Sequence, residues 1–175
     1  DATLRDQHDP LSLQAALTKL QTAWAATASA KKGLDDKGRT VFGPVTQAAV
    51  ELLNQIGDSS NLVLDPDIDS YYLVNALVLT LPPTMENVGQ LWGWGTYAAI
   101  RGGIGSESEK SWYVWDARVK SGVEDARAYL RRAWDANPAL KSKLDLAAFD
   151  HALALRKVGE LAVFDANAPA PADYY

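Results

Sequence analysis

The stretch Asn61-Leu-Val-Leu-Asp-Pro-Asp-Ile-Asp-Ser-Tyr-Tyr-Leu-Val-Asn75 decides the fold that we predict for this chain. Asp65 can accept hydrogen bonds from the free backbone N–H groups that begin a helix. Pro66 suits the first helical position, because it has no N–H to leave without a partner. Asp67 and Asp69 place negative charge in the first turn, where the helix dipole favours it. The stretch therefore predicts a helix that begins at Pro66.

A long apolar stripe follows this predicted start. Its residues recur at intervals of four and three, which is typical of one face of a helix. They are Leu73, Leu77, Leu81, Met85, Val88 and Trp92. We expect this helix to end near Arg101, before Gly102-Gly-Ile-Gly105, so that it is roughly 50 Å long. Pro82 and Pro83 lack an N–H group, which predicts a kink or a local opening of the helical hydrogen bonds.

Four further segments have the pattern of amphipathic helices, over about residues 10–30, 45–56, 107–136 and 140–162. Asp9-Pro10 repeats the start signal before the first of them, and Ser106 with Glu109 forms a capping-box pattern before the third. The third also has heptad-type spacing, which predicts a seam between helices. The seam residues are Trp112, Trp115, Val119, Gly122, Ala126, Tyr129 and Ala133.

These five helical stretches and their short connections predict an all-α fold, an elongated up-and-down helical bundle with one long Pro-kinked helix. We expect residues 1–164 to form one helical-bundle domain. The Ala/Pro-rich residues 165–175 are predicted to be a flexible tail.

Composition restricts the function classes. The chain has 175 residues, of which 47% are hydrophobic, and this is enough for the core of one domain. It has no cysteine, so disulfides and thiol nucleophiles are excluded. The net charge is −5 and no Lys/Arg-rich run occurs, which argues against nucleic acid and anionic membrane surfaces as partners. No apolar run reaches the ~18 residues typical of a membrane span.

The segment Ser60-Asn-Leu-Val-Leu-Asp-Pro-Asp-Ile-Asp-Ser-Tyr-Tyr-Leu73, with Leu81-Pro82 downstream, resembles a pattern found in known receptors. It is similar to S-x-L-x-L-D-P-D-x-D-S-Y-Y-L in the periplasmic, all-helical sensor domains of bacterial transmembrane receptors. These receptors are methyl-accepting chemotaxis proteins and sensor histidine kinases. The resemblance is specific over roughly residues 45–103 and looser to residue 161. The motif residues that it marks are Asp65, Pro66, Asp67, Asp69, Tyr71, Tyr72 and Asn75.

The resemblance implies a role but names no ligand. It implies a periplasmic ectodomain that binds a small molecule, forms a homodimer and relays a helix displacement to a cytoplasmic chemotaxis or kinase module. The membrane helices would then lie outside this chain. It implies no cofactor and no catalysis.

The three motif aspartates also allow a calcium-loop interpretation, because Asp at positions one, three and five begins an EF-hand loop. Position six should be Gly and is Ser70, and position twelve should be Glu and is Ala76. Helix capping is therefore favoured over metal binding, and a bond from Asp67 or Asp69 to a neighbouring helix or loop is the remaining alternative. His8 and His151 do not have ligand spacing, and His151 is predicted to be buried on an apolar stripe.

Aromatic residues gather on both sides of the turn at 102–105, and we expect them to meet at one end of the bundle. They are Trp92, Trp94 and Tyr97 before the turn and Trp112 and Trp115 after it, with Arg101 and Arg118 nearby. Core packing is the favoured interpretation. The alternatives are a ligand pocket whose arginine binds a carboxylate, and a patch for dimerisation.

Three function classes follow from the sequence. The resemblance favours a sensor domain of a transmembrane receptor. A helical scaffold or adaptor that binds another protein fits the helical pattern equally well. A helical enzyme is disfavoured, because no group of residues meets the geometric requirements of a catalytic site.

Overall fold

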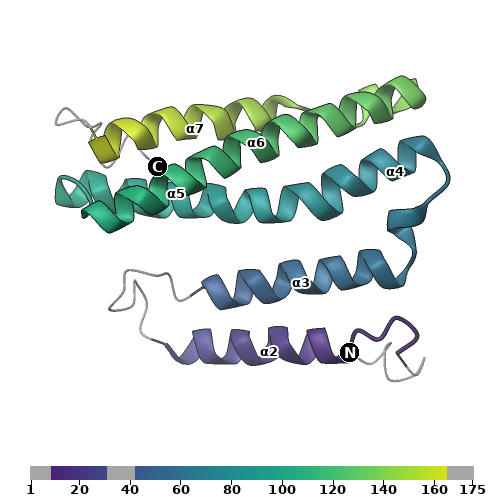
Figure 1. Cartoon of the computed structure of the whole chain (residues 1–175), viewed down its shortest axis with the longest axis horizontal. Helices are drawn as coiled ribbons and strands as arrows, with labels where there is room; N and C mark the ends of the chain where they lie inside the picture. The colour runs from purple at the N-terminus through teal and green to yellow at the C-terminus, as the bar shows by residue number, and fades with distance from the viewer. Residues whose placement is uncertain (1–8, 31–41, 165–175) are drawn as a thin grey trace.

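The computed structural model describes residues 9–30 and 42–164, which form helices and turns with no strand among them. The helices are α2 (Gln14–Ser29), α3 (Gly43–Ser59), α4 (Ile68–Val74), α5 (Leu81–Arg101), α6 (Ser106–Ala136) and α7 (Ala147–Phe164). The π-helical segment η2 (Asn75–Thr80) joins α4 to α5, and the 3-10 segments η1 (Leu62–Leu64) and η3 (Pro138–Ser142) precede α4 and α7. The described chain therefore runs up and down an elongated all-α bundle, as predicted (Figure 1). The predicted tail, 165–175, lies outside the described residues.

The helices divide into a well-packed group and a hairpin beside it (Figure 1). The buried core cluster comes from η2, α5, α6 and α7, and α4 packs along α6. Its members are Ala76, Leu91, Trp94, Ala98, Trp112, Val119, Val123, Ala126, Leu130, Phe149 and Val163. The hairpin of α2 and α3 contributes none of these residues, and α2 has no buried residue. Most of the hydrophobic stabilisation therefore lies in the group from α4 to α7.

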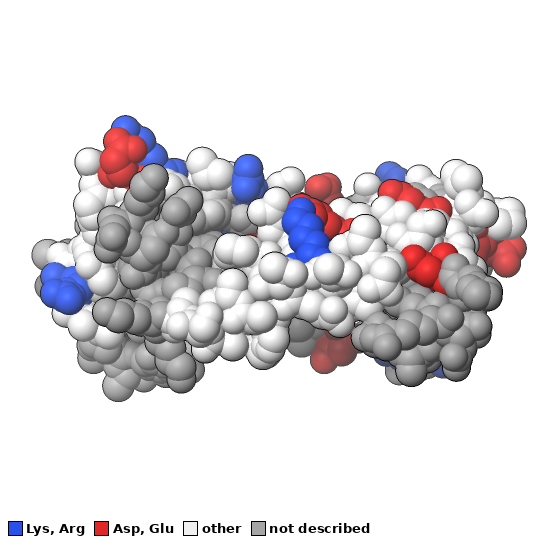
Figure 2. All heavy atoms as spheres, turned by 90° about the horizontal axis from the view of Figure 1, so that it is seen from below, with Lys and Arg blue, Asp and Glu red and all other residues white. Residues whose placement is uncertain are grey.

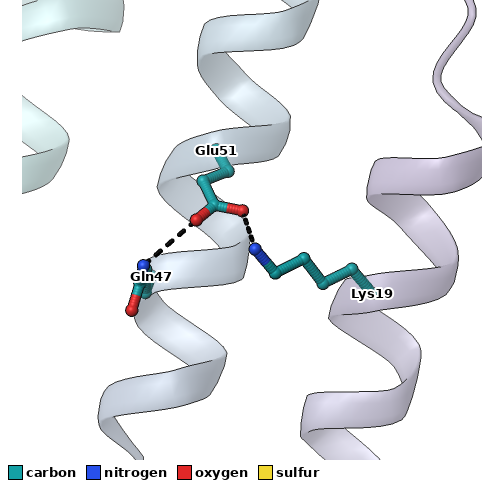
Figure 3. A network of polar contacts seen from close by, with 3 residues as sticks. All are labelled: Lys19, Gln47 and Glu51. Atoms are coloured by element: carbon teal, nitrogen blue, oxygen red, sulfur yellow. Dashed lines mark hydrogen bonds and ion pairs between the residues drawn. The ribbon is translucent and has the colours of Figure 1, made fainter.

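The hairpin is joined within itself by a polar contact between its two helices (Figure 3). The Lys19 ammonium donates to one carboxylate oxygen of Glu51, and the Gln47 amide donates to the other at 3.1 Å. The hydrogen bond from Lys19 lowers the pKa of Glu51 below its usual value of 4.5. Both charged side chains are at least 40% exposed, so the pair contributes little to stability.

The start of α4 differs from the prediction. The helix begins at Ile68, and Asp67 holds the N-cap position without a side-chain capping bond. The Asp65 carboxylate accepts a hydrogen bond at 2.9 Å from the Asp67 backbone N–H, which forms a local turn before the helix. Asx-type turns of this kind compete with helix capping for the same side chain. Of the three aspartates, only Asp69 lies in the first helical turn.

The predicted opening of the long helix is confirmed at η2. Pro82 and Pro83 stand at the start of α5, where they supply no N–H to the preceding turn. The Leu81 N–H bonds the carbonyl of Ala76, five residues back, and the Thr80 hydroxyl bonds the carbonyl of Asn75 at 2.7 Å. The wider π turns therefore replace α-helical bonding just before the prolines.

The π segment changes which side of the helix faces the core. The predicted stripe assumed a constant α-helical period, and half of it is wrong: Leu77, Met85 and Trp92 are 45%, 60% and 45% exposed. Leu91 and Ala98 are fully buried instead. Since Leu91 precedes Trp92 by one residue, the buried face of α5 is offset by about one position from the predicted one.

The prediction for α6 is confirmed in its main feature. Trp112, Val119, Ala126 and Ala133 are buried along the predicted seam, and the helix begins at Ser106. The capping box is not formed, because the N-cap position belongs to Gly105. The prediction for His151 is wrong: α7 begins at Ala147, and on this helix His151 is exposed.

Candidate functional site

The motif segment packs against the C-terminal half of α6, and we name this contact the motif end. The Asn137 amide donates to the Asp69 carboxylate at 2.8 Å. The Tyr72 ring stacks on Tyr129 with centroids 6.2 Å apart, and the Arg132 guanidinium lies 5.5 Å from the Tyr72 centroid. Two of the motif residues therefore hold α4 against α6, a helix that is distant in the sequence.

The electrostatics of the motif end favour an ionised Asp69. The hydrogen bond from Asn137, and then that from the Ser70 backbone N–H, lower the pKa of Asp69 below its usual value of 3.8. Of the three interpretations of the motif aspartates, the structure therefore contains the bond from Asp69 to a neighbouring segment. Asn137 lies between the predicted helical segments that end near 136 and begin near 140, and nothing in the sequence indicates Asp69 as its partner.

The remaining motif residues make local contacts. Tyr71 is 40% exposed and meets Tyr72 edge-on at 5.3 Å, and the Asn75 amide donates to the Tyr71 carbonyl at 2.8 Å. Pro66 and Asp67 are exposed. Within residues 9–30 and 42–164, no group of three or more His, Asp or Glu side chains is placed to hold a metal ion.

The opposite end of the group is aromatic, and we name it the aromatic end. Trp94 stacks on Trp115 with centroids 6.2 Å apart and meets Tyr97 edge-on at 5.6 Å. The Arg101 guanidinium lies 5.8 Å from the Tyr97 centroid. Trp112 is 1% exposed in the core below. The predicted meeting across the turn is therefore confirmed for Trp94 and Trp115.

Burial separates the structural residues of the aromatic end from those that a ligand could reach. Trp94 and Trp112 are core residues, as the packing interpretation expects. Tyr97 is 38% exposed and Arg101 is exposed, so the reachable surface is an aromatic ring edged by a guanidinium. Such a surface can pair with a carboxylate.

The other two candidates lie apart from this cluster. Trp92 is two residues from Trp94, which places it about 200° around the helix, and it is 45% exposed. Arg118 is exposed on α6, beyond the turn that holds Trp115. Of the predicted set, the structure therefore brings together Trp94, Tyr97, Arg101 and Trp115, with Trp112 beneath them.

Sequence reasoning missed the ion pairs that join α6 to α7. Arg156 donates through Nε and one terminal nitrogen to the two oxygens of Asp116, at 2.7 and 2.6 Å. Arg127 pairs with Asp150, and its guanidinium lies 5.7 Å from the Phe149 centroid. These partners are 40 and 23 residues apart, so no local pattern in the sequence indicates them.

Comparisons with protein-family models, curated proteins and solved structures find no match to this chain. None of the helices in the described ranges is long and apolar enough to span a membrane. We therefore infer function from the residues themselves and from the geometry of the two ends.

Proposed function

We propose that this chain is the periplasmic signal-sensing domain of a bacterial transmembrane receptor. It binds a small molecule or a partner and relays a helix displacement to a cytoplasmic chemotaxis or kinase module, without catalysis or a cofactor. The observation that carries the proposal is the segment from Ser60 to Leu73, with its likeness to such receptors. Tyr72 contacts α6, and Asp69 bonds Asn137, the residue that follows α6, so the motif joins α4 to the end of that helix.

The helices offer a physical route for the signal. The α4–η2–α5 rod and α6 both run from the motif end to the aromatic end (Figure 1). A ligand that binds one packing of these helices better than another shifts the population toward that packing. Displacements of packed helices by about 1–2 Å are a known form of such a change. At the aromatic end, Tyr97 and Arg101 are the groups that would meet an anionic ligand.

The direction of the chain adds a requirement to this proposal. The start of α2 and the end of α7 lie at opposite ends of the bundle (Figure 1). A receptor whose two flanking helices enter the same membrane then needs one further pass of chain along the bundle. The parent gene supports the proposal if it encodes membrane spans around this domain.

A thermal-shift screen tests ligand binding. Organic acids and amino acids are the compounds to screen, because a ligand of the folded state raises the unfolding midpoint by mass action. Arg101→Ala should abolish the shift produced by a carboxylate, and Arg131→Ala, an exposed arginine of α6, should retain it. A shift unchanged by Arg101→Ala removes the aromatic end as the binding site, and a screen without any shift contradicts small-molecule sensing.

A helical scaffold or adaptor is the alternative function. It is favoured by the large apolar side chains that α5 exposes, since patches of this kind mark protein-interaction sites. A parent gene that encodes this domain alone, without membrane spans, would support the adaptor and oppose the receptor.

A further inference from the structure

Helix α5 has an exposed apolar stripe on the side away from the core. Met85, Trp92 and Ile100 are 60%, 45% and 62% exposed, and Gly89 and Gly93 are exposed between them. Their spacings of three, four, seven and eight residues place all five on one face of the helix. We name these five residues the α5 stripe.

Within the described residues, no contact explains the two glycines of the stripe. A Cβ atom added at Gly89 or Gly93 would meet no heavy atom within 4 Å, and neither residue has a positive φ. Glycine inside a helix is less stable than alanine, so an intrachain reason would be expected. Gly122 has such a reason, because its Cβ would lie 2.0 Å from the Thr84 hydroxyl oxygen. A Gly-x-x-x-Gly spacing places both glycines on one face, where a second helix can approach closely.

Charge indicates which helix fits this face. One of the eight exposed residues of α5 is charged, compared with nine of the sixteen exposed residues of α6. The stripe itself has no charge, although the chain has a net charge of −5. A two-fold contact places the same patch on both sides, so a neutral patch avoids the repulsion that two acidic copies would otherwise feel.

The size of the patch agrees with a dimer contact. A large apolar side chain has a surface of roughly 200 Å², so three half-exposed ones and the flanking Tyr97 present about 400 Å². A stable interface buries about 800 Å² per partner, of which somewhat over half is apolar. The α5 stripe together with Tyr97 therefore supplies most of the apolar area that such an interface needs.

We infer that a second copy of this chain packs its own α5 across the α5 stripe, with the two helices crossing at Gly89 and Gly93. This inference deepens the proposed function, because it names the surface through which the receptor domain forms a homodimer. It also places the interface on the rod that joins the motif end to the aromatic end. Mass measurements test the dimer, whereas the ligand screen tests sensing, so the failure of one is distinguishable from the failure of the other.

The test is the oligomeric state of two matched variants of the full chain. Gly93→Arg puts bulk and charge at the proposed crossing, where the monomer has open space for it. Ala25→Arg puts the same side chain on the exposed face of α2. In sedimentation equilibrium, Gly93→Arg should raise the dimer dissociation constant at least about tenfold, and Ala25→Arg should leave it unchanged. Circular dichroism should show the same helix content in both.

Cysteine cross-linking gives a second readout, because the natural chain has no cysteine. Oxidation should link Gly93→Cys into a covalent dimer and leave Ala25→Cys as single chains. The inference is overturned if the natural chain stays monomeric into the hundred-micromolar range, a result that assigns the stripe to a different protein. It is equally overturned if Gly93→Arg remains dimeric, or if Ala25→Arg dissociates the dimer, which would place the interface on α2.

Discussion

Gly122 sets the distance between α5 and α6. A Cβ atom at this position would lie 2.0 Å from Thr84 Oγ1 and 3.0 Å from its Cβ and Cγ2 atoms. Thr84 is 4% exposed, and its hydroxyl donates to the Thr80 carbonyl at 2.7 Å, in the turn that the prolines open. Thr84 therefore has little freedom to move aside, and a side chain at position 122 must push the helices apart.

We expect Gly122→Ala to destabilise the fold by about 1–3 kcal/mol, the usual cost of overpacking a core. Urea unfolding measures this, with Ser121→Ala as the exposed control on the same helix, for which a change within about 0.5 kcal/mol is expected. Adding Thr84→Ala to Gly122→Ala should cost less than the sum of the two single changes. Strict additivity would show that the two residues do not meet.

Asp69 makes the motif end sensitive to acid. Its pKa is lowered in the folded state by the hydrogen bond from Asn137, so its contribution to stability is present above its usual value of 3.8. That contribution is lost as the pH falls through the lower folded pKa. We therefore expect Asn137→Ala to lower the thermal midpoint at neutral pH, by an amount that shrinks below pH 3.8.

Thermal unfolding between neutral and strongly acidic pH measures this difference, and Asn54→Ala, an exposed asparagine of α3, is the control. If Asn137→Ala lowers the thermal midpoint by the same amount at every pH, the Asn137 side chain acts through packing and not through the Asp69 carboxylate.

At the scale of elements, the sequence predicts α6 well and α5 poorly, for one physical reason. Helix α6 keeps a regular period, so counting along its sequence finds Trp112 and Val119 in the core. The rod that contains α5 includes η2, whose wider turns break the period and expose Met85. The prolines at 82 and 83 predict that the helical hydrogen bonds open, but they do not predict which face of the following helix points to the core.

Contacts between elements that are distant in the sequence could not be predicted from local patterns. Asp69 and Asn137 are 68 residues apart, and each has a sufficient local explanation as a helix-start or helix-end residue. The meeting of Trp94 with Trp115 could be predicted, because a short turn joins their helices. Sequence therefore identified the aromatic end and only half of the motif end.

The ion pair between Asp116 and Arg156 is expected to hold α7 on α6. The two side chains are only 26% and 20% exposed, and they make two parallel hydrogen bonds. Asp116→Asn should cost about 1–3 kcal/mol in urea unfolding, since it leaves a partly buried guanidinium without its countercharge. Lys19→Gln, which breaks the more exposed pair of the α2–α3 hairpin, should cost less than about 1 kcal/mol. Equal losses of unfolding free energy in the two variants would contradict this ranking.

At the scale of the whole molecule, two sets of contacts lie at opposite ends of the same pair of helical rods. Figure 2, viewed from the side of α2, shows only scattered charged side chains on the described part of this face. The motif end ties α4 to α6, the aromatic end ties α5 to α6, and η2 lies between them on the rod. The proposed function requires that a change of packing at the motif end displaces the helices at the aromatic end.

Distances between paired spin labels test that claim most directly. Labels at Arg101→Cys on α5 and Glu160→Cys on α7 report the aromatic end, in protein diluted with unlabelled chain. Releasing the motif end with Tyr72→Ala should shift this distance by about 1–2 Å, the displacement typical of helices that relay a signal. Lys19→Gln in the hairpin should leave it unchanged. An aromatic end that keeps the same distance in the Tyr72→Ala protein would contradict the relay.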